Sequence, residues 1–580
     1  MALYRVNMNA TSMIYNCYKF CVNVTKLDLS KIQTTVKNEQ FSLRFVSPYS
    51  TGRKINLQNY INKRKHEASR SIIVQVATFK SCKELLLFCS NFGPIEKAYF
   101  YTLPKQHQFV LIEFRNKNSL DNIYANTAFM DESNYVPCRT NVLWFRKTKQ
   151  EKTNQKYYFG LPKINVCSPL IVQENSIKDA LISSLSISNQ MTNLYQKYKL
   201  DELEIRLKFQ TIVQLEKCFQ GFFPNITIHP FGSFVNGYGK KLSDLDLILF
   251  TDVCKKDSTS NRLVYHGKST NIDEKQHTHA FMGVLADSMK YIIPGIFNVR
   301  KIFNARVPII KFQNFFTHTE CDLSLSNTIA TYMSELLFLY GEEDERVRPL
   351  VFTIRKWAED NKLTSIHPGK TITNFSLTLL VIFYLQQVDI LPGINSITTF
   401  SEISNNNKNN VRGIYTNYSP NLSKSHVNND AHLSALLIDL FKFYATFDFG
   451  SQKICLRTAT AIKSMHNAAL YICNPFETEL NVSKNVSFNE IQRMKALMTV
   501  AISNLQNTKP IKTRKWGILS ILNFPESHNV SINVLKIFDK ETNTENTQDD
   551  KTITNVQEND VSDTLNVETN DEIVTNKNLM

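Results

Sequence analysis

The stretch HPFGSFVNGYGKKLSDLDLILF, residues 229–250, holds a glycine turn followed by a strand that opens on two aspartates. Side chains two residues apart on a strand point to the same face. Asp244 and Asp246 therefore point together, while the leucines that alternate with them point into a core. Paired carboxylates repel each other unless a cation lies between them, and hard divalent ions such as Mg2+ prefer oxygen ligands. The strand therefore predicts a metal site.

The turn before this strand has the composition of a phosphate-binding loop. Gly232 lets a polyphosphate approach the backbone closely, and Ser233 adds a hydroxyl beside Phe231. An isolated Asp-x-Asp is most often a solvated strand end, and a Gly-Ser turn alone is uninformative. The two together, with Ser233 eleven residues before Asp244, are far rarer. The combination indicates a site for nucleotidyl transfer.

A third carboxylate follows downstream. The segments ARVPIIKF at 305–312 and ECDLS at 320–324 are both predicted strands. Asp322 alternates with apolar neighbours, so an adjacent strand can bring it beside Asp244 and Asp246. Three carboxylates are what a two-metal phosphoryl-transfer site needs. We therefore expect these aspartates to hold two ions of Mg2+ or Mn2+.

Length and charge indicate several domains and a polyanionic partner. The 580 residues are enough for two to four domains, each with its own core. The net charge is +15, but residues 541–580 carry ten acidic against two basic side chains, so the first 540 residues carry +23. This balance favours salt-sensitive binding to a polyanion. The eleven cysteines form no Cys-x-x-Cys pair, which argues against zinc and against a secreted disulfide framework.

The amino-terminal stretch has the composition of an organellar presequence. The first 60 residues contain eight Lys or Arg against two acidic residues, with Ser, Thr and Asn among hydrophobic residues. We expect residues 1–65 to be presequence and linker, ending in the basic cluster Lys63-Arg64-Lys65. The longest apolar run, Phe375–Leu385, has eleven residues, too few to cross a bilayer. No membrane span is therefore expected.

Residues 70–147 show the order βαββαβ, which resembles an RNA-recognition motif. Strands are predicted at 72–78, 95–101, 109–114 and 142–146, with helices at 82–92 and 119–129. Such domains stack bases on aromatic residues of the central strands, but Ile73 and Leu111 occupy two of these positions. Exposed aliphatic residues on a sheet face suit a protein contact. We therefore expect this domain to serve as a protein contact or as a spacer rather than to read bases.

The remaining segments are mostly helical. Residues 252–295 are polar and contain His277-x-His279, a spacing that could bind a metal, although the composition favours a solvated loop. Helices are predicted over 176–222, 329–387, 433–447 and 488–504, with an Asn- and Ser-rich loop insertion over 401–432. Beyond residue 540 the acidic, weakly hydrophobic composition predicts a disordered tail.

Several motifs together carry a family resemblance. They are HPFGS with SDLD, ARVPIIKF with CDLSLSN, SELLFLYG, TNFSLTLLVIFYLQ and CNPFETELNVSKNVS. The chain resembles the DNA polymerase β-like nucleotidyltransferases, in the branch of template-independent poly(A) polymerases and terminal uridylyltransferases. Within that branch it is most similar to the mitochondrial poly(A) polymerases, over roughly residues 70–520.

The resemblance implies an α+β fold with a defined order of parts. These are a presequence and linker (1–65), the recognition-motif-like domain (70–147), a linker (150–172), a helical segment on the core (173–222), a nucleotidyltransferase palm (223–328), a helical poly(A)-polymerase-associated domain (329–520) and the acidic tail (540–580). Relatives of this type dimerise through the recognition-motif-like domain. A homodimer through residues 70–147 is therefore implied.

The resemblance also implies roles for individual residues. Asp244, Asp246 and Asp322 match the metal-binding carboxylates. The nucleotide-binding positions match Phe231, Gly232, Ser233, Asn327, Arg355 and Phe375. In relatives the position of Asn327 contacts the ribose, that of Arg355 the triphosphate, and that of Phe375 stacks on the base. Without the family, Arg355 would be interpreted as a surface charge and Phe375 as a core residue.

Two positions depart from the family pattern. Glu359 stands where relatives often place a second cation for the triphosphate, so that contact is in doubt unless Lys356 or Lys362 substitutes. Phe375 stands where relatives usually have Tyr. It keeps a stacking face but lacks the hydroxyl, so any polar contact from that position is lost.

The implied activity is the addition of adenosines from ATP to the 3′ end of mitochondrial RNA in the matrix, with release of pyrophosphate. Terminal uridylyl transfer is an alternative, because base choice depends on a few polar contacts that the sequence does not place. An inactive scaffold that only binds RNA is a further alternative, which the complete aspartate triad disfavours.

Overall fold

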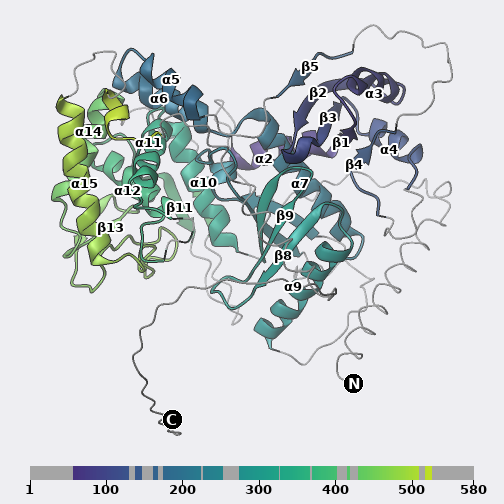
Figure 1. Ribbon diagram of the computed structural model, residues 1–580. Coiled ribbons are helices and arrows are strands. Elements are labelled where there is room, and N and C mark those ends of the chain that lie inside the picture. Colours follow the sequence, from purple (N-terminus) through teal and green to yellow (C-terminus); the bar gives the residue numbers. More distant parts are fainter. Residues whose placement is uncertain are drawn as a thin grey trace, which may run out of the picture. The chain divides into compact units, whose positions relative to one another are not determined.

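The computed structural model describes residues 56–129, 138–146, 161–167, 174–223, 226–251, 273–325, 327–365, 367, 369–401, 415–418, 429–507 and 516–524 (Figure 1). Four predicted segments fall mostly or wholly outside these ranges. They are the presequence up to residue 55, most of the linker at 150–172, most of the insertion at 401–432, and the acidic tail.

The first sheet belongs to the recognition-motif-like domain, drawn in purple to blue in Figure 1. Its order is β4-β1-β3-β2-β5, from strands β1 (Ser71–Val76), β2 (Ile95–Thr102), β3 (Gln108–Phe114), β4 (Val142–Trp144) and β5 (Ile164–Val166). Helices α3 (Ser81–Ser90) and α4 (Asn118–Ala125) pack on one face through an apolar core. The predicted βαββαβ order is confirmed. The edge strand β5 is an addition that the sequence did not indicate, within a segment predicted as linker.

Helix α7 (Glu202–Gln220) serves two apolar cores at once. It begins at a capping box, in which the Asp201 carboxylate accepts from the Glu204 N–H at 2.8 Å and Glu204 accepts in return at 3.3 Å. Leu203 and Leu207 pack on the first sheet, while Phe209 and its neighbours join the core of the second. The helix therefore connects the two sheets.

The second face of the first sheet is covered by the chain itself. Ile73 and Leu111 are each 1% exposed and pack against α7. The Tyr101 hydroxyl donates to the Phe316 carbonyl at 2.9 Å, and the Phe109 ring lies 6.1 Å from that of Phe316. The expectation that Ile73 and Leu111 form an exposed partner surface is therefore wrong, because the catalytic part of the same chain buries them.

Helix α2 (Leu57–Ser69) corrects the expected amino-terminal boundary. Its apolar residues Leu57 and Ile61 are buried in the core of the second sheet. Arg64 binds Glu202 of α7 with two hydrogen bonds of 2.7 and 2.9 Å. Residues 57–65 are therefore folded structure and not linker, because their basic cluster pairs with carboxylates of α7 that the sequence alone does not place nearby.

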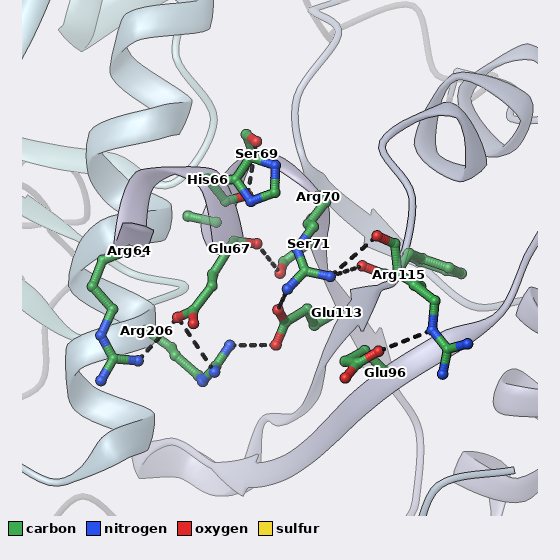
Figure 2. A network of polar contacts seen from close by, with 12 residues as sticks. Arg64, His66, Glu67, Ser69, Arg70, Ser71, Glu96, Glu113, Arg115 and Arg206 are labelled. Carbon is green, nitrogen blue, oxygen red and sulfur yellow. Dashed lines mark hydrogen bonds and ion pairs between the residues drawn. The ribbon is translucent and has the colours of Figure 1, made fainter. Parts of the chain in front are cut away.

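A buried network of charges joins α2, β3 and α7. Figure 2 shows Arg64, Glu67, Arg70, Glu113 and Arg206 gathered at this junction. Arg206 donates to Glu113 at 2.6 Å, and the two side chains are 4% and 1% exposed. Glu67 binds Arg64 at 3.0 Å and lies 3.4 Å from Arg206, while Arg70 pairs with Glu113. Charges buried this deeply are tolerated only when paired, so the network constrains how the first domain meets the catalytic body.

The second sheet, drawn in teal, has the order β6-β7-β10-β9-β8. Its strands are β6 (Ile226–Phe231), β7 (Leu245–Thr251), β8 (Ile296–Ile302), β9 (Ile309–Asn314) and β10 (Thr319–Leu325). Strands β7 and β10 run parallel, and the other neighbours are antiparallel. Its apolar side chains pack with those of α7 and α9 (Glu274–Tyr291).

Helix α9 corrects a further expectation. Residues 252–295 were expected to form a solvated loop, but 274–291 are helical, with Met282, Leu285 and Met289 buried. These apolar residues recur at helical spacing after an Asp273 cap that accepts from the Gln276 N–H at 2.7 Å. His277 and His279 stand two apart on this helix, where side chains do not face each other. The pair is therefore not a metal-binding pair.

The rest of the described chain is largely helical, as predicted. The helices are α5 (Glu174–Ile182), α6 (Ile187–Tyr198), α8 (Ser233–Asn236), α10 (Thr328–Glu343), α11 (Val347–Asp360), α12 (Asn374–Gln387), α13 (Ile394–Ile397), α14 (Leu433–Thr446) and α15 (Phe488–Asn507). Two small hairpins, β11–β12 (Thr398–Ser401, Tyr415–Tyr418) and β13–β14 (Gln452–Cys455, Thr460–Lys463), were not predicted. Within the described ranges, none of the helices has the length and apolarity needed to cross a membrane.

Candidate active site

Strand β7 carries the two adjacent aspartates at its beginning. Leu245, Leu247 and Leu249 are fully buried, and Asp246 points to the opposite face. Asp244 stands immediately before the strand and keeps half of its side chain, 52%, exposed. The predicted alternation, with leucines in the core and aspartates on the opposite face, is therefore confirmed.

Asp322 lies directly beside Asp246. Strands β10 and β7 are parallel, and their register pairs Asp322 with Asp246. The same register pairs Cys321 with Leu245 and so places Glu320 next to Asp244. Four carboxylates therefore form a two-by-two arrangement on one face of the sheet, of which the sequence analysis identified three.

A lysine on β9 lies among these carboxylates. Lys311 is paired with Asp322 in the antiparallel register, and its ammonium lies 3.2 Å from Asp322 Oδ1. The same nitrogen lies 3.8 Å from Asp244 Oδ2 and 3.7 Å from Glu320 Oε2. The sequence analysis missed Lys311 and Glu320, although their alternation with Ile310, Phe312 and Cys321 places both on the polar face.

Burial and mutual repulsion set the electrostatics of the site. Burial, followed by the charges of Asp322 and Asp244, raises the pKa of Asp246 to about 7. Burial also raises the pKa of Asp244, against the opposing influence of Lys311. On α7, Lys208 donates to the Ser243 carbonyl, and burial lowers its pKa. The site therefore favours any cation that can approach the carboxylates.

Position 232 requires a glycine because the backbone there lies against the Asp246 carboxylate. Gly232 has a φ of +71°, and a Cβ at this position would lie 2.4 Å from Asp246 Oδ2. Its N–H donates to the Ser334 hydroxyl at 2.7 Å, which fixes the turn on α10. Ser233 begins α8, and Phe231 pairs with Asp246 across β6 and β7. The structure thus brings the predicted phosphate-binding turn against the predicted metal-binding strand.

The three remaining predicted nucleotide contacts lie on separate helices. Asn327 is the N-cap of α10, two residues after β10, and its side chain makes no capping hydrogen bond. Arg355 on α11 donates to the Tyr238 carbonyl at 2.7 Å, and burial lowers its pKa to about 10. Phe375 is the second residue of α12 and is half-buried. Arg355 is therefore held against the loop that follows the Gly232 turn.

Glu359, which departs from the family pattern, forms an ion pair with a lysine. Both carboxylate oxygens of Glu359 accept from the Lys240 ammonium, at 2.9 and 3.0 Å. Lys240 lies two residues after Tyr238, whose carbonyl binds Arg355. Lys356 pairs with Asp360 at 2.8 Å and is mostly buried, so it is engaged elsewhere. The cation beside Glu359 therefore comes from Lys240, which the sequence analysis did not consider.

The donor set fits a hard divalent ion. As they stand, no three Asp, Glu, His or Cys side chains in the described part of the chain converge closely enough to hold a metal. The Lys311 ammonium, within 3.8 Å of Asp244 and Asp322, stands in for a cation at this position. Carboxylate oxygens on a partly open sheet face are ligands that suit Mg2+ and Mn2+. Asp244, Asp246 and Asp322 are the residues that would hold such an ion.

Several known proteins are similar to this chain in sequence and in structure. Residues 187–342 match the family model described as "Poly(A) RNA polymerase, mitochondrial-like, central palm domain", and residues 56–128 match the "RL domain". The chain is 35% identical to the mitochondrial poly(A) RNA polymerase of Drosophila melanogaster, over 77% of this chain and 76% of that protein. It is 31% identical to the Homo sapiens protein of the same name, over 80% of each.

Solved structures of mtPAP are also similar to this chain. The crystal structure of mtPAP in complex with ATPγS is similar with a TM-score of 0.69 and 30% identity, over 80% of this chain and 99% of that one. The complex of mtPAP with CTP is similar with a TM-score of 0.71 and 30% identity, over 81% and 99% of the two chains.

Proposed function

This chain belongs to the mitochondrial poly(A) RNA polymerases, and on that premise we propose that it extends mitochondrial RNA with adenosine, without a template, in the mitochondrial matrix. It is a poly(A) RNA polymerase, a nucleotidyltransferase that acts on RNA and takes ATP as its substrate. The observation that carries the site assignment is the strand register that pairs Asp322 with Asp246. We assign catalysis to these two residues and Asp244.

The proposed mechanism gives each residue a physical task. Asp244, Asp246 and Asp322 would hold two ions of Mg2+ or Mn2+. Once bound, such ions lower the pKa of the RNA 3′-hydroxyl and neutralise the charge of the leaving pyrophosphate. The turn at Gly232 and Ser233 brings its backbone close enough to orient the triphosphate for in-line attack on the α-phosphate.

The remaining nucleotide contacts come from the helices. We assign Asn327 to the ribose, Arg355 to the triphosphate and Phe375 to stacking on the base. We assign to Lys240, whose ammonium pairs with Glu359, the second triphosphate contact that the Glu359 carboxylate itself cannot make. Phe231, which pairs with Asp246 across β6 and β7, is assigned to the same nucleotide site.

The RNA backbone is assigned to the basic side of the same face. Arg300 on β8 is paired with Lys311 and is exposed, so acidic and basic residues succeed one another across the sheet. Basic groups next to a metal site hold a phosphate backbone without reading its sequence. The net charge of the first 540 residues supports the same assignment.

The test is extension of an RNA primer by the purified full chain with Mg2+ or Mn2+ and each NTP separately. We expect ATP to be the preferred substrate. Because mtPAP has been solved with ATPγS, CTP, UTP and GTP, binding alone does not report preference, and the rate of incorporation must be measured. Equal or faster incorporation of UTP would identify a uridylyltransferase, and no incorporation would identify a scaffold.

We also propose a homodimer formed through the domain at 70–147. Because α7 covers one face of the first sheet, the free surface is the helix side, where Phe88 of α3 is 47% exposed. Phe88 lies 6.0 Å from Phe145 and 5.2 Å from Phe92, so these three aromatic residues form one cluster on the helix side. Exposed aromatic clusters are typical of protein interfaces.

The dimer is tested by the substitution Phe88→Arg. Light scattering should give the mass of a dimer for the wild type and of a monomer for the variant. Tyr291→Arg is the matched control, because this aromatic residue is 55% exposed but stands on α9 of the catalytic sheet. A wild type that is monomeric, or a variant that stays dimeric, would contradict the proposal.

A further inference from the structure

Three strands place opposite charges in one row across the catalytic sheet. Strand β10 lies between β7 and β9, and its Asp322 is paired with Asp246 on one side and with Lys311 on the other. Directly paired residues present their side chains to the same face. The Lys311 ammonium is therefore built into the row of carboxylates and does not reach it by chance from a flexible surface loop.

A second row offers the same lysine another partner. Glu320 is paired with Gln313 of β9, which donates to Glu320 Oε1 at 2.8 Å, and Glu320 Oε2 lies 3.7 Å from the Lys311 ammonium. The Glu320 side chain is 46% exposed and is farther from Asp246 than Asp322 is in the register. It can accept the ammonium without occupying the position between Asp244 and Asp322.

We propose that Lys311 is a resident counter-cation of the catalytic carboxylates, and that Glu320 receives its ammonium when a divalent ion binds. The proposal rests on the assignment of Asp244, Asp246 and Asp322 as metal ligands. It accounts for an arrangement in which three carboxylates share one face and yet do not converge, since the ammonium lies within 3.8 Å of two of them. Lys311 and Glu320 are positioning residues in this scheme, because they act on the metal ligands.

The scheme predicts opposite effects of two substitutions on metal binding. Without the ammonium, a divalent ion meets no competitor, so Lys311→Met should tighten binding. Without the receiving carboxylate, the ammonium stays with Asp322, so Glu320→Gln should weaken binding. In the double variant the second effect should vanish, because Glu320 acts only through Lys311. A purely structural role for either residue would weaken binding in every variant.

The experiment is a Mn2+ titration of the metal-free full chain by isothermal titration calorimetry, without nucleotide or RNA. We expect Kd to fall about tenfold in Lys311→Met and to rise about threefold to tenfold in Glu320→Gln, where tenfold corresponds to 1.4 kcal/mol. Lys311→Arg should restore the wild-type Kd to within about twofold, because it keeps the charge. Thermal unfolding in EDTA should show that Lys311→Met lowers the stability of the metal-free protein.

The control is Lys301→Met on β8, whose ammonium binds Asp287 at 2.8 Å on α9, outside the carboxylate group. This substitution should leave Kd unchanged. Unchanged or weaker Mn2+ binding by Lys311→Met would overturn the inference, as would a Glu320→Gln effect that persists in the double variant. A wild type whose Mn2+ binding is insensitive to Asp322→Asn would instead refute the metal-ligand assignment itself.

Discussion

The two five-stranded sheets of this chain use their second faces in opposite ways. In each sheet one face packs on helices. The other face of the first sheet is apolar and aromatic, and α7 with the β9–β10 turn covers it. The other face of the catalytic sheet carries Asp246, Asp322 and Lys311 and stays partly open. The comparison teaches that strand order alone says little about function, which depends on the residues that the free face presents.

The largest effect is expected from a substitution of Asp246 on the open face of the catalytic sheet. Asp246→Asn keeps the shape of the side chain but removes a charge assigned to both metal ions. We expect primer extension to fall by at least about 10,000-fold, equivalent to more than about 5 kcal/mol of barrier. Circular dichroism should show an unchanged fold. Asp287→Asn, on α9 of the same domain, is the control and should retain full activity.

The next largest effect is expected at the buried network of charges that joins α2, β3 and α7. Arg206→Met would leave Glu113 and Glu67 buried without this partner, and breaking a buried pair typically costs about 3–5 kcal/mol. Urea unfolding should show a loss of that size. Arg115→Met is the matched control, since Arg115 binds Glu96 at 3.2 Å on the surface of the same domain and should cost less than about 1 kcal/mol. Equal losses in the two variants would show that the network is not a structural clamp.

The stability of the metal-free protein should depend on pH because Asp246 lies on the open face of the catalytic sheet. The pKa of Asp246 is raised from its ordinary value of 3.8 to about 7, so between these values the folded chain binds more protons than the unfolded chain. Raising pH through this window therefore lowers the stability of the metal-free protein. Asp246→Asn lacks this loss, and its advantage over wild type in EDTA should grow by roughly 1–3 kcal/mol from pH 4 to pH 7. A constant difference would contradict the raised pKa.

The sequence predicted the polar face of the catalytic sheet better than the covered face of the first sheet, for physical reasons. Alternation of aspartate with leucine at 244–249 gives both the strand and its polar face, and the same pattern at 320–324 places Asp322. In β1 and β3 the runs IIV (72–74) and FVLI (109–112) are apolar at every position, which is typical of strands buried on both faces. That signal was available, and it contradicted the exposed partner face expected at Ile73 and Leu111.

Other features could not be derived from local patterns. Glu113 and Arg206 are ordinary charged residues in sequence, and their pairing across 93 positions exists only once the domain docks on α7. The same is true of the pair between Lys240 and Glu359, which joins residues 119 positions apart. Long-range pairs of this kind leave no periodic signal, whereas side-chain alternation along one strand does.

The smallest expected effect gives the most specific test of how the first sheet supports the second. The Tyr101 hydroxyl donates at 2.9 Å to the carbonyl of Phe316, in the turn that connects β9 with β10 and so Lys311 with Asp322. Tyr101→Phe should cost about 0.5–1.5 kcal/mol in urea unfolding, the usual value of one such hydrogen bond. Tyr124→Phe is the matched control, because the buried Tyr124 hydroxyl has no hydrogen-bond partner, so its removal should not destabilise. If covering this face serves only to stabilise the first domain, Tyr101→Phe should leave the Mn2+ affinity unchanged. A weakened affinity in Tyr101→Phe, with none in Tyr124→Phe, would instead show that the first sheet helps to position Asp322.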